Sequence, residues 1–149
     1  MTTLLRTDSI HPDFILLVQQ LDRELAVVDG EDHAFYSQFN KIDKIRHAVV
    51  AYENEIPVAC GAVKEYLPGI MEIKRMFTIP AERGKGMARR ILGELETWAK
   101  EMSYTKCVLE TGERLPDAIA LYQKCGYHKI PNYGQYEGVE NSVCFEKQL

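Results

Sequence analysis

The stretch of sequence that decides the fold reads MEIKRMFTIPAERGKGMARRILGELETWA and covers residues 71–99. Its first part, residues 71–79, alternates apolar and other side chains as a β-strand does, and Pro80 ends that strand. We expect one face of the strand to carry Met71, Ile73, Phe77 and Ile79. The other face would carry Glu72, Lys74, Met76 and Thr78.

A basic loop with two glycines follows the strand and leads into an amphipathic helix. Residues 74–90 hold six basic side chains and the single acid Glu82, a net charge of +5 in a chain whose net charge is −4. Glycines allow backbone N–H groups to converge on an anion, and a helix N-terminus adds unpaired donors and a partial positive charge. A strand, a basic loop and a helix in this order favour a phosphate-binding site over a merely solvated charged surface. The apolar face of the helix consists of Ala88, Ile91, Leu92, Leu95, Trp98, Ala99 and Met102.

The segments on either side alternate between helices and strands. An apolar stripe at helical spacing begins after Pro12, and a short helix is expected over residues 34–39. Two apolar runs, residues 47–52 and 56–66, predict an antiparallel hairpin in which Gly61 marks a bulge. Further elements follow as a strand at 106–110, a helix at 116–125 and a strand at 142–146. This order predicts a single three-layer α/β or α+β domain.

Length and composition exclude several classes of protein. The chain has 149 residues, of which 46% are hydrophobic and 27% charged, as in one soluble globular domain. It has no apolar run of about 20 residues and no signal peptide at its start, so a cytoplasmic protein without membrane contact is expected. The net negative charge argues against nucleic-acid binding. Four cysteines without a Cys-x-x-Cys pair predict reduced core thiols, and four scattered histidines predict no metal site.

In these motifs the chain resembles the GNAT acyltransferase superfamily. Arg83 to Ala88 matches the family's acyl-CoA signature, in which Arg or Gln is followed by two residues, Gly, one residue, and Gly or Ala. Residues 72–80 look like the family's central strand, and residues 118–122 followed by Gly126-Tyr127 resemble its second cofactor motif. The resemblance implies an α/β (α+β) fold in which a mixed, mostly antiparallel sheet of six to seven strands has helices on both faces. Residues 47–148 would form the sheet and the acetyl-CoA-binding core, and residues 1–45 a helical region on the acceptor side.

The resemblance also implies roles for individual residues. Met76, Phe77 and Thr78 would offer backbone groups to the pantetheine arm. The pyrophosphate would lie on the backbone of Gly84, Lys85, Gly86, Met87, Ala88 and Arg89, with the side chains of Arg83 and Lys85 nearby. Many family members carry an Asn seven residues before the tyrosine of the second motif. Leu115 stands there in this chain and has no side-chain amide to make that contact with the cofactor.

Two catalytic residues are implied in the same way. Tyr122 would stand beside the cofactor sulfur as general acid, although core packing is the ordinary role of such a tyrosine. Glu72 lies eleven residues before Arg83, the offset of the catalytic glutamate in the histone-acetylating branch. It would act as base, with Glu65 or water as the alternative and an ion pair with Lys74 or Arg75 as its structural role.

The expected activity is direct transfer of an acetyl group from acetyl-CoA to a primary amine of a small molecule or peptide, without a metal. The alternatives are a non-catalytic acyl-CoA-binding module and, last, a nucleotide- or RNA-binding protein. A homodimer is compatible with the sequence, which leaves the acceptor open. Acidic side chains in residues 22–32 would attract a cationic amine, or would simply be the solvated end of a helix. They are Asp22, Glu24, Asp29, Glu31 and Asp32, against Arg23.

Overall fold

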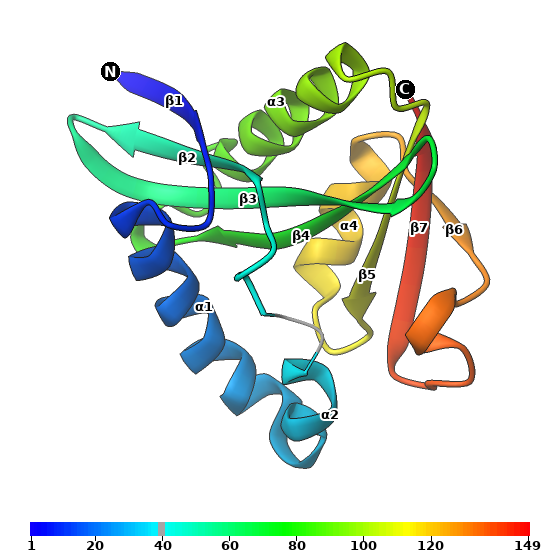
Figure 1. Ribbon diagram of the computed structural model, residues 1–149. Helices are drawn as coiled ribbons and strands as arrows, with labels where there is room; N and C mark the ends of the chain where they lie inside the picture. The colour runs from blue at the N-terminus through cyan, green and yellow to red at the C-terminus, as the bar shows by residue number, and fades with distance from the viewer. Residues whose placement is uncertain (39–40) are drawn as a thin grey trace.

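A single twisted sheet forms the middle of the molecule (Figure 1). The computed structural model describes residues 1–38 and 41–149. Its helices and strands are β1 (Thr2–Thr7), α1 (Pro12–Asp29), α2 (His33–Ser37), β2 (His47–Glu53), β3 (Ile56–Leu67), β4 (Ile70–Thr78), α3 (Met87–Glu101), β5 (Lys106–Gly112), α4 (Pro116–Lys124), β6 (His128–Ile130) and β7 (Ser142–Gln148).

The order of the strands across the sheet is β1-β2-β3-β4-β5-β7-β6. Every neighbouring pair is antiparallel except β4 and β5, which are parallel. A parallel pair needs a crossover, and α3 between the two strands supplies it. The mixed, mostly antiparallel seven-stranded sheet expected from the sequence is therefore confirmed for the described residues.

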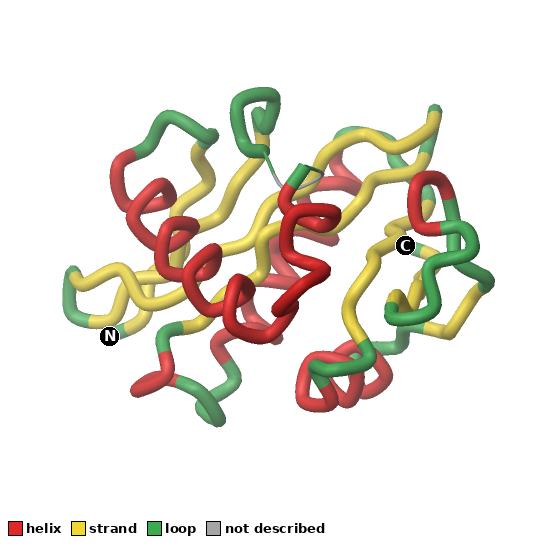
Figure 2. The backbone as a smooth tube through the Cα atoms, turned by 90° about the horizontal axis from the view of Figure 1, so that it is seen from below, coloured by secondary structure: helices red, strands yellow, loops and turns green. Residues whose placement is uncertain are grey.

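The sheet has a hydrophobic core on each face. On one face the buried residues of α3, from Met87 to Ala99, and Tyr122 of α4 pack against Ile73 and Leu109 of the sheet. On the other face α1 packs its stripe, formed by Phe14, Leu17, Val18 and Leu21, against β2, β3 and β4. Figure 2 shows helices on both sides of the strands. The three-layer architecture follows directly from two apolar helix faces that need cover.

Gly61 of β3 is a position where the two layers come especially close. A Cβ atom there would lie 2.5 Å from Sδ of Met76 and 2.7 Å from Cγ2 of Ile91. Only glycine therefore lets α3 pack this closely on the sheet. The ladder between β3 and β4 also changes register between Cys60 and Ala62, which confirms an irregularity at the predicted place.

That irregularity overturns the predicted faces of β4. Cys60 pairs with Phe77 and Ala62 with Lys74, so β4 holds one more residue than β3 between these pairs. The extra residue is accommodated by a β-bulge in which Arg75 has φ +57°. The bulge reverses the alternation, so Ile73 faces the core under α3 whereas Phe77 faces the core under α1. The prediction that Met71, Ile73, Phe77 and Ile79 share one face is wrong.

The N-terminal region differs from the expected helical segment in having a strand. Residues 2–7 form β1, which pairs with β2 at the edge of the sheet and buries none of its side chains completely. An edge strand of this kind lacks a strong apolar pattern. The short helix expected at residues 34–39 corresponds to α2, His33–Ser37, while Phe39 lies outside the described residues. The three-residue strand β6 was also not expected.

Three of the four cysteines, Cys60, Cys107 and Cys144, are buried as expected of core thiols, whereas Cys125 is only partly buried. All four cysteines are free, and burial raises the pKa of Cys60 and Cys107 to about 12, so both stay protonated at neutral pH. None of the helices within the described ranges is both long and apolar enough to cross a bilayer. In the same part of the chain, no three His, Cys, Asp or Glu side chains are grouped as a metal site.

Candidate active site

The two central strands separate where the cavity begins. β4 and β5 pair from Ile70–Lys106 to Glu72–Val108, and beyond Glu72 no residue of β4 has a partner on β5 in the described chain. Figure 1 shows the two arrows diverging from the side where they pair. The backbone N–H and C=O groups that face this opening are available to an extended ligand, which could add to β4 as a strand does.

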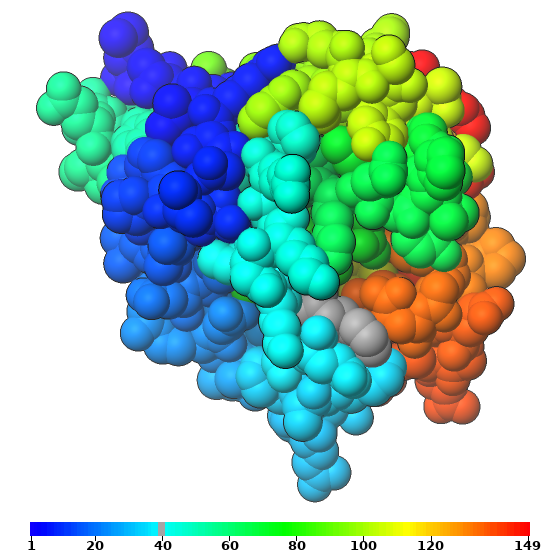
Figure 3. Space-filling view, in the orientation of Figure 1, coloured from blue at the N-terminus to red at the C-terminus, as the bar shows by residue number. Residues whose placement is uncertain are grey.

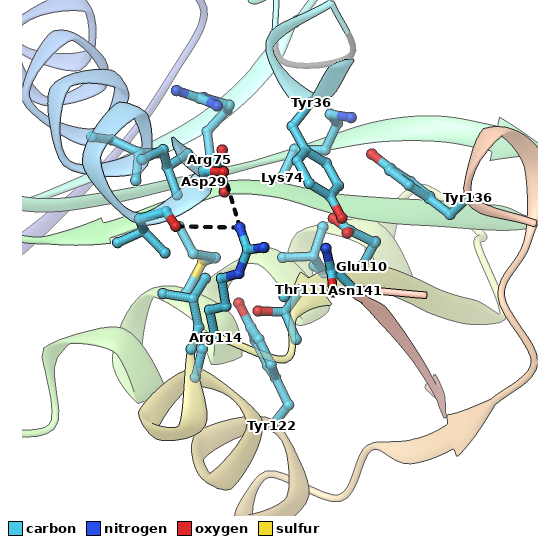
Figure 4. Close-up of a pocket in the computed structure, with 18 of the residues that line it drawn as sticks. Asp29, Tyr36, Lys74, Arg75, Glu110, Thr111, Arg114, Tyr122, Tyr136 and Asn141 are labelled. Carbon is cyan, nitrogen blue, oxygen red and sulfur yellow. Dashed lines mark hydrogen bonds between the residues drawn. The ribbon is translucent and has the colours of Figure 1, made fainter. Parts of the chain in front are cut away.

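A cavity of about 160 Å³ lies at this separation, between α1, β4, β5 and α4. Figure 4 shows its polar residues converging from these elements, with Tyr122 rising from α4 and Tyr36 approaching Glu110 from the opposite side. In the space-filling view, the cyan segment that follows α1 lies between the blue atoms of α1 and the orange atoms before β7 (Figure 3). The polar residues lining the cavity are Asp29, Tyr36, Glu72, Lys74, Arg75, Glu110, Thr111, Arg114, Tyr122, Tyr136 and Asn141.

The glycine loop lies between β4 and α3. Gly84 has φ +79° and Gly86 has φ +83°, a backbone region that side chains with a Cβ rarely adopt. The helix begins at Met87 without a side-chain cap. From Gly84 to Arg89 no backbone N–H group donates a hydrogen bond to any described residue. The loop thus presents a set of free donors at a helix N-terminus, as an anion site requires.

The side chain of Arg83 is engaged within the protein rather than free beside this loop. Its Nε donates to the carbonyl oxygen of Thr78 at 2.8 Å, and its Nη2 lies 2.7 Å from Glu24 Oε2. The guanidinium also stands over the ring of Phe77, 5.6 Å from its centroid. These contacts tie the loop to β4 and α1, so the backbone donors, rather than Arg83, are the groups available to a phosphate. Lys85 pairs with Glu82 at 3.2 Å.

Glu110 is the titratable group that the sequence analysis missed. It lies near the end of β5, and its Oε2 accepts a hydrogen bond of 2.7 Å from Ser142 Oγ, which in turn lies 3.2 Å from Tyr36 Oη. Burial raises the pKa of Glu110 to about 7, although Ser142 and Lys74 act in the opposite direction. A carboxyl that titrates near neutral pH inside a cavity is suited to accept a proton. The available signal was its place at the carboxyl end of a buried strand.

Glu72, the base expected from the sequence, also lines the cavity but is tightly held. Tyr133 Oη donates a hydrogen bond to Oε2, and Lys74 Nζ lies 3.4 Å from Oε1. Of the two predicted ion pairs, the one with Lys74 is present, whereas Arg75 pairs with Asp22 instead. Glu65, the second candidate, is exposed, accepts a hydrogen bond from Tyr104 and does not line the cavity.

Tyr122, the general acid expected from the resemblance, lies at the cavity. Its side chain is buried at the wall of the cavity, near the rings of Tyr127 and Phe145 at 5.9 and 6.3 Å. Burial raises its pKa well above the usual value, so the hydroxyl keeps its proton at neutral pH. It therefore combines a packing role with a hydroxyl that faces the cavity (Figure 4). Leu115 lines the same cavity.

Most of the acidic side chains near α1 have basic partners. Three of them form ion pairs with arginines: Asp22 with Arg75, Glu24 with Arg83, and Asp32 with Arg114. The expected acidic rim is therefore largely neutralised, which weakens the argument for a polycationic acceptor. Arg89 and Arg90, in contrast, are exposed and form no ion pair within the described residues.

Comparison with known proteins identifies the family. The acetyltransferase (GNAT) family profile matches residues 15–127. An IAA acetyltransferase from Azospirillum brasilense is 31% identical over 150 residues, which cover 99% of this chain and 97% of that one. A solved structure from Klebsiella pneumoniae, assigned to the acyl-CoA N-acyltransferases, has a TM-score of 0.84 at 26% identity and covers 100% of this chain and 98% of its own.

Another solved structure with this fold contains coenzyme A. The PaiA N-acetyltransferase of Thermoplasma acidophilum, solved in complex with coenzyme A, has a TM-score of 0.73 at 14% identity, with 99% of each chain covered. At that identity the likeness concerns the fold alone. The profile match and the Azospirillum relative carry the assignment, because they extend over most of the chain. The chain belongs to the GNAT family of acetyltransferases.

Proposed function

We propose that this protein transfers the acetyl group of acetyl-CoA directly to a primary amine of a small molecule or peptide. The observation that carries the proposal is the separation of β4 from β5 over a cavity that holds both Glu110 and Tyr122. Acetyl transfer requires one group to accept a proton from the amine and another to give a proton to the thiolate. Glu110 and Tyr122 have different environments on one cavity and can supply these two transfers.

The cosubstrate would bind along β4 and the glycine loop. Backbone groups of Met76, Phe77 and Thr78 would meet the pantetheine arm, and the free N–H groups of residues 84–89 would meet the pyrophosphate. The exposed Arg89 side chain supports this placement, because it adds positive charge at the start of α3. Backbone N–H groups at the strand opening would polarise the thioester carbonyl.

Glu110 is the base that we favour for the amine, and Glu72 is the second. An attacking amine must be neutral, so a group in the cavity has to accept its proton. Glu110 titrates near pH 7 and can therefore do so at neutral pH, whereas both oxygens of Glu72 already have partners within the protein. The proton would leave Glu110 towards Ser142 and Tyr36.

Tyr122 would supply the proton for the departing thiolate. The C–N bond forms as the C–S bond breaks, and the sulfur then takes the phenolic proton. In water a thiol has a pKa near 8.5 and a phenol near 10, so the transfer is mildly uphill. Burial raises the pKa of Tyr122 and also that of a thiol formed in the same cavity, so the two shifts offset each other in part.

The experiment is a CoA-release assay over primary amines, amino acids, aminoglycosides and peptide N-termini, with the wild type, Glu110→Gln, Tyr122→Phe and Glu72→Gln. We expect kcat to fall at least about tenfold in Glu110→Gln and Tyr122→Phe, with unchanged CoA affinity, because a general acid or base contributes on the order of 100- to 10,000-fold. Glu113→Gln, an exposed position after β5, is the control.

Two results would redirect the proposal. If the protein binds CoA but releases no thiol with any amine, the non-catalytic acyl-CoA-binding module is the better description. If Glu72→Gln loses activity while Glu110→Gln retains it, the base is Glu72.

A further inference from the structure

The bulge in β4 places two basic side chains on one face of the sheet. In a regular strand Lys74 and Arg75 would point to opposite faces. Here Arg75 has φ +57°, and it reaches Asp22 of α1, while Lys74 pairs with Ala62, which belongs to the core under α1. Both side chains are buried, with 8% of Lys74 and 1% of Arg75 exposed, and both line the cavity.

Neither cation is fully satisfied by the protein. Lys74 has three donors, and its contact with Glu72 is 3.4 Å long, whereas charge-assisted hydrogen bonds are typically about 2.7–2.9 Å. Nη2 of Arg75 donates a hydrogen bond to Asp22, but the buried Nε of Arg75 has no partner among the described residues. A buried charge without full hydrogen bonding is costly, so these two groups favour an anion in the cavity.

A base lies beside these cations. Lys74 acts electrostatically on Glu110 across the cavity, and Asp29 and Glu72 also face that carboxyl. The cavity thus contains a proton acceptor, Glu110, and two cations, Lys74 and Arg75. Its volume of about 160 Å³ suits a small molecule.

We propose that the acceptor is a small amino acid, whose carboxylate is held by Lys74 and Arg75 while its amine is presented to Glu110. This inference rests on the proposed function. The amine nitrogen forms the C–N bond and gives its proton to Glu110, the C–S bond breaks, and the sulfur takes a proton from Tyr122. The products are an N-acetylated amino acid and CoA, and the proton on Glu110 returns through solvent to the Tyr122 phenolate. A peptide N-terminus or a polyamine lacks the carboxylate next to the amine and would leave both cations without a counter-ion.

The experiment compares matched acceptors that differ only in the carboxylate. The wild type is assayed for CoA release with alanine, leucine and phenylalanine, with their carboxamides, and with ethylamine, isopentylamine and phenethylamine. We expect at least one amino acid to exceed its own amide and amine in kcat/KM by about tenfold or more, since a charge-assisted pair to a buried cation is lost in the latter two. Equal values within each triplet overturn the carboxylate site and leave acetyl transfer intact.

Variants then locate the anion site. Lys74→Met keeps the length of the side chain without its charge, and we expect the ratio of kcat/KM for the acid to that for its amine to fall to about one. Lys74 also lowers the pKa of Glu110, so both acceptors slow together at a given pH and only the ratio reports the carboxylate contact. Lys100→Met, on the exposed side of α3, is the matched control. A preference that survives in Lys74→Met and in Arg75→Gln overturns the assignment to these residues.

A binding measurement separates this inference from the proposed function. The melting temperature of the CoA-bound protein is recorded with each of the nine compounds. Amino acids that stabilise the complex without any CoA release overturn the proposed transfer and keep the carboxylate site. The absence of both stabilisation and release overturns both.

Discussion

At the scale of single residues, Glu110 shows how a fold sets the chemistry of a carboxyl. The side chain alternation of β5 places Cys107 and Leu109 in the core under α3, and it directs Glu110 to the opposite face, into the cavity. Burial there disfavours the charged form, and the hydroxyl of Ser142 partly offsets this effect. The pKa near 7 therefore results from two opposed contributions of the surroundings.

Ser142→Ala tests this balance directly. The hydroxyl donates to the ionised carboxylate and so lowers the pKa of Glu110, which means that its removal raises that pKa. As the pH is lowered, activity that needs the ionised carboxylate is then lost at a higher pH than in the wild type. We expect the acidic limb of the kcat/KM profile to move upward by roughly one pH unit, since a hydrogen bond to a charged group is worth about 1.5–3 kcal/mol.

Ser142→Thr is the matched control because it keeps the hydroxyl, and its profile should resemble that of the wild type. If Ser142→Ala lowers the rate equally at every pH, Ser142 is a structural residue of β7 and does not position the base. The other charged groups that face Glu110 are Lys74, Glu72 and Asp29, and they are unchanged in both variants.

At the scale of elements, the glycine loop and α3 form one anion-binding unit. Gly86→Asp would place a carboxylate among the free N–H groups of residues 84–89 and would force a Cβ into a backbone with φ +83°. We expect CoA affinity to fall by at least about 100-fold, because the introduced carboxylate is negative, like the pyrophosphate, and would lie in its site. In the wild type, CoA affinity should also decrease as salt rises. Titration calorimetry measures both.

Gly93→Ala in the same helix separates loop geometry from helix stability. Gly93 has a helical backbone and nothing within 4 Å of an added Cβ, so alanine should stabilise the protein by about 0.5–1 kcal/mol and leave CoA affinity unchanged. A folded Gly86→Asp protein that binds CoA as well as Gly93→Ala does would exclude this loop as the phosphate site.

The elements with strong periodic patterns were predictable from the sequence, and so was their assembly. Strand β4, the loop and α3 were located within a residue or two, because apolar spacing and the turn residues agree there. The bulge at Arg75 was not predictable in its consequence. The register shift lies opposite Gly61 of β3, where Met76 and Ile91 come close, so it involves residues that lie far apart in the sequence.

The candidate site was predictable only in part for the same reason. Glu72 and Tyr122 were recognised from their positions in motifs and do line the cavity. Glu110 stands in no motif, and its pKa arises from Ser142, Lys74 and the depth of the cavity, which only the folded chain brings together. The pairing of Arg83 with Glu24 is likewise a contact between distant segments.

At the scale of the whole molecule, long-range ion pairs hold the first helix over the cavity. Arg75, Arg83 and Arg114 come from three separate segments, and each reaches an acid in residues 22–32. The pairs with Arg83 and Arg114 are substantially exposed, so each adds little stability. Their common effect is to position α1 against the opening between β4 and β5.

The titration of Glu110 should make the free energy of unfolding of the protein depend on pH. Its pKa is raised from 4.5 to about 7 by folding, so between these pH values the folded protein holds a proton that the unfolded chain has lost. Stability then falls as pH rises through this interval, and above pH 7 the full cost of a buried carboxylate is present. Glu110→Gln removes that cost. We expect its free energy of unfolding to exceed that of the wild type by on the order of 2 kcal/mol at pH 8, and by little at pH 5.

Urea denaturation at the two pH values measures the difference, and the exposed Glu113→Gln should show none. A gain in stability that is the same at both pH values would mean that Glu110 is not the group that titrates, whereas a gain confined to pH 8 in an enzyme with reduced kcat would show that the protein gives up stability to keep its base.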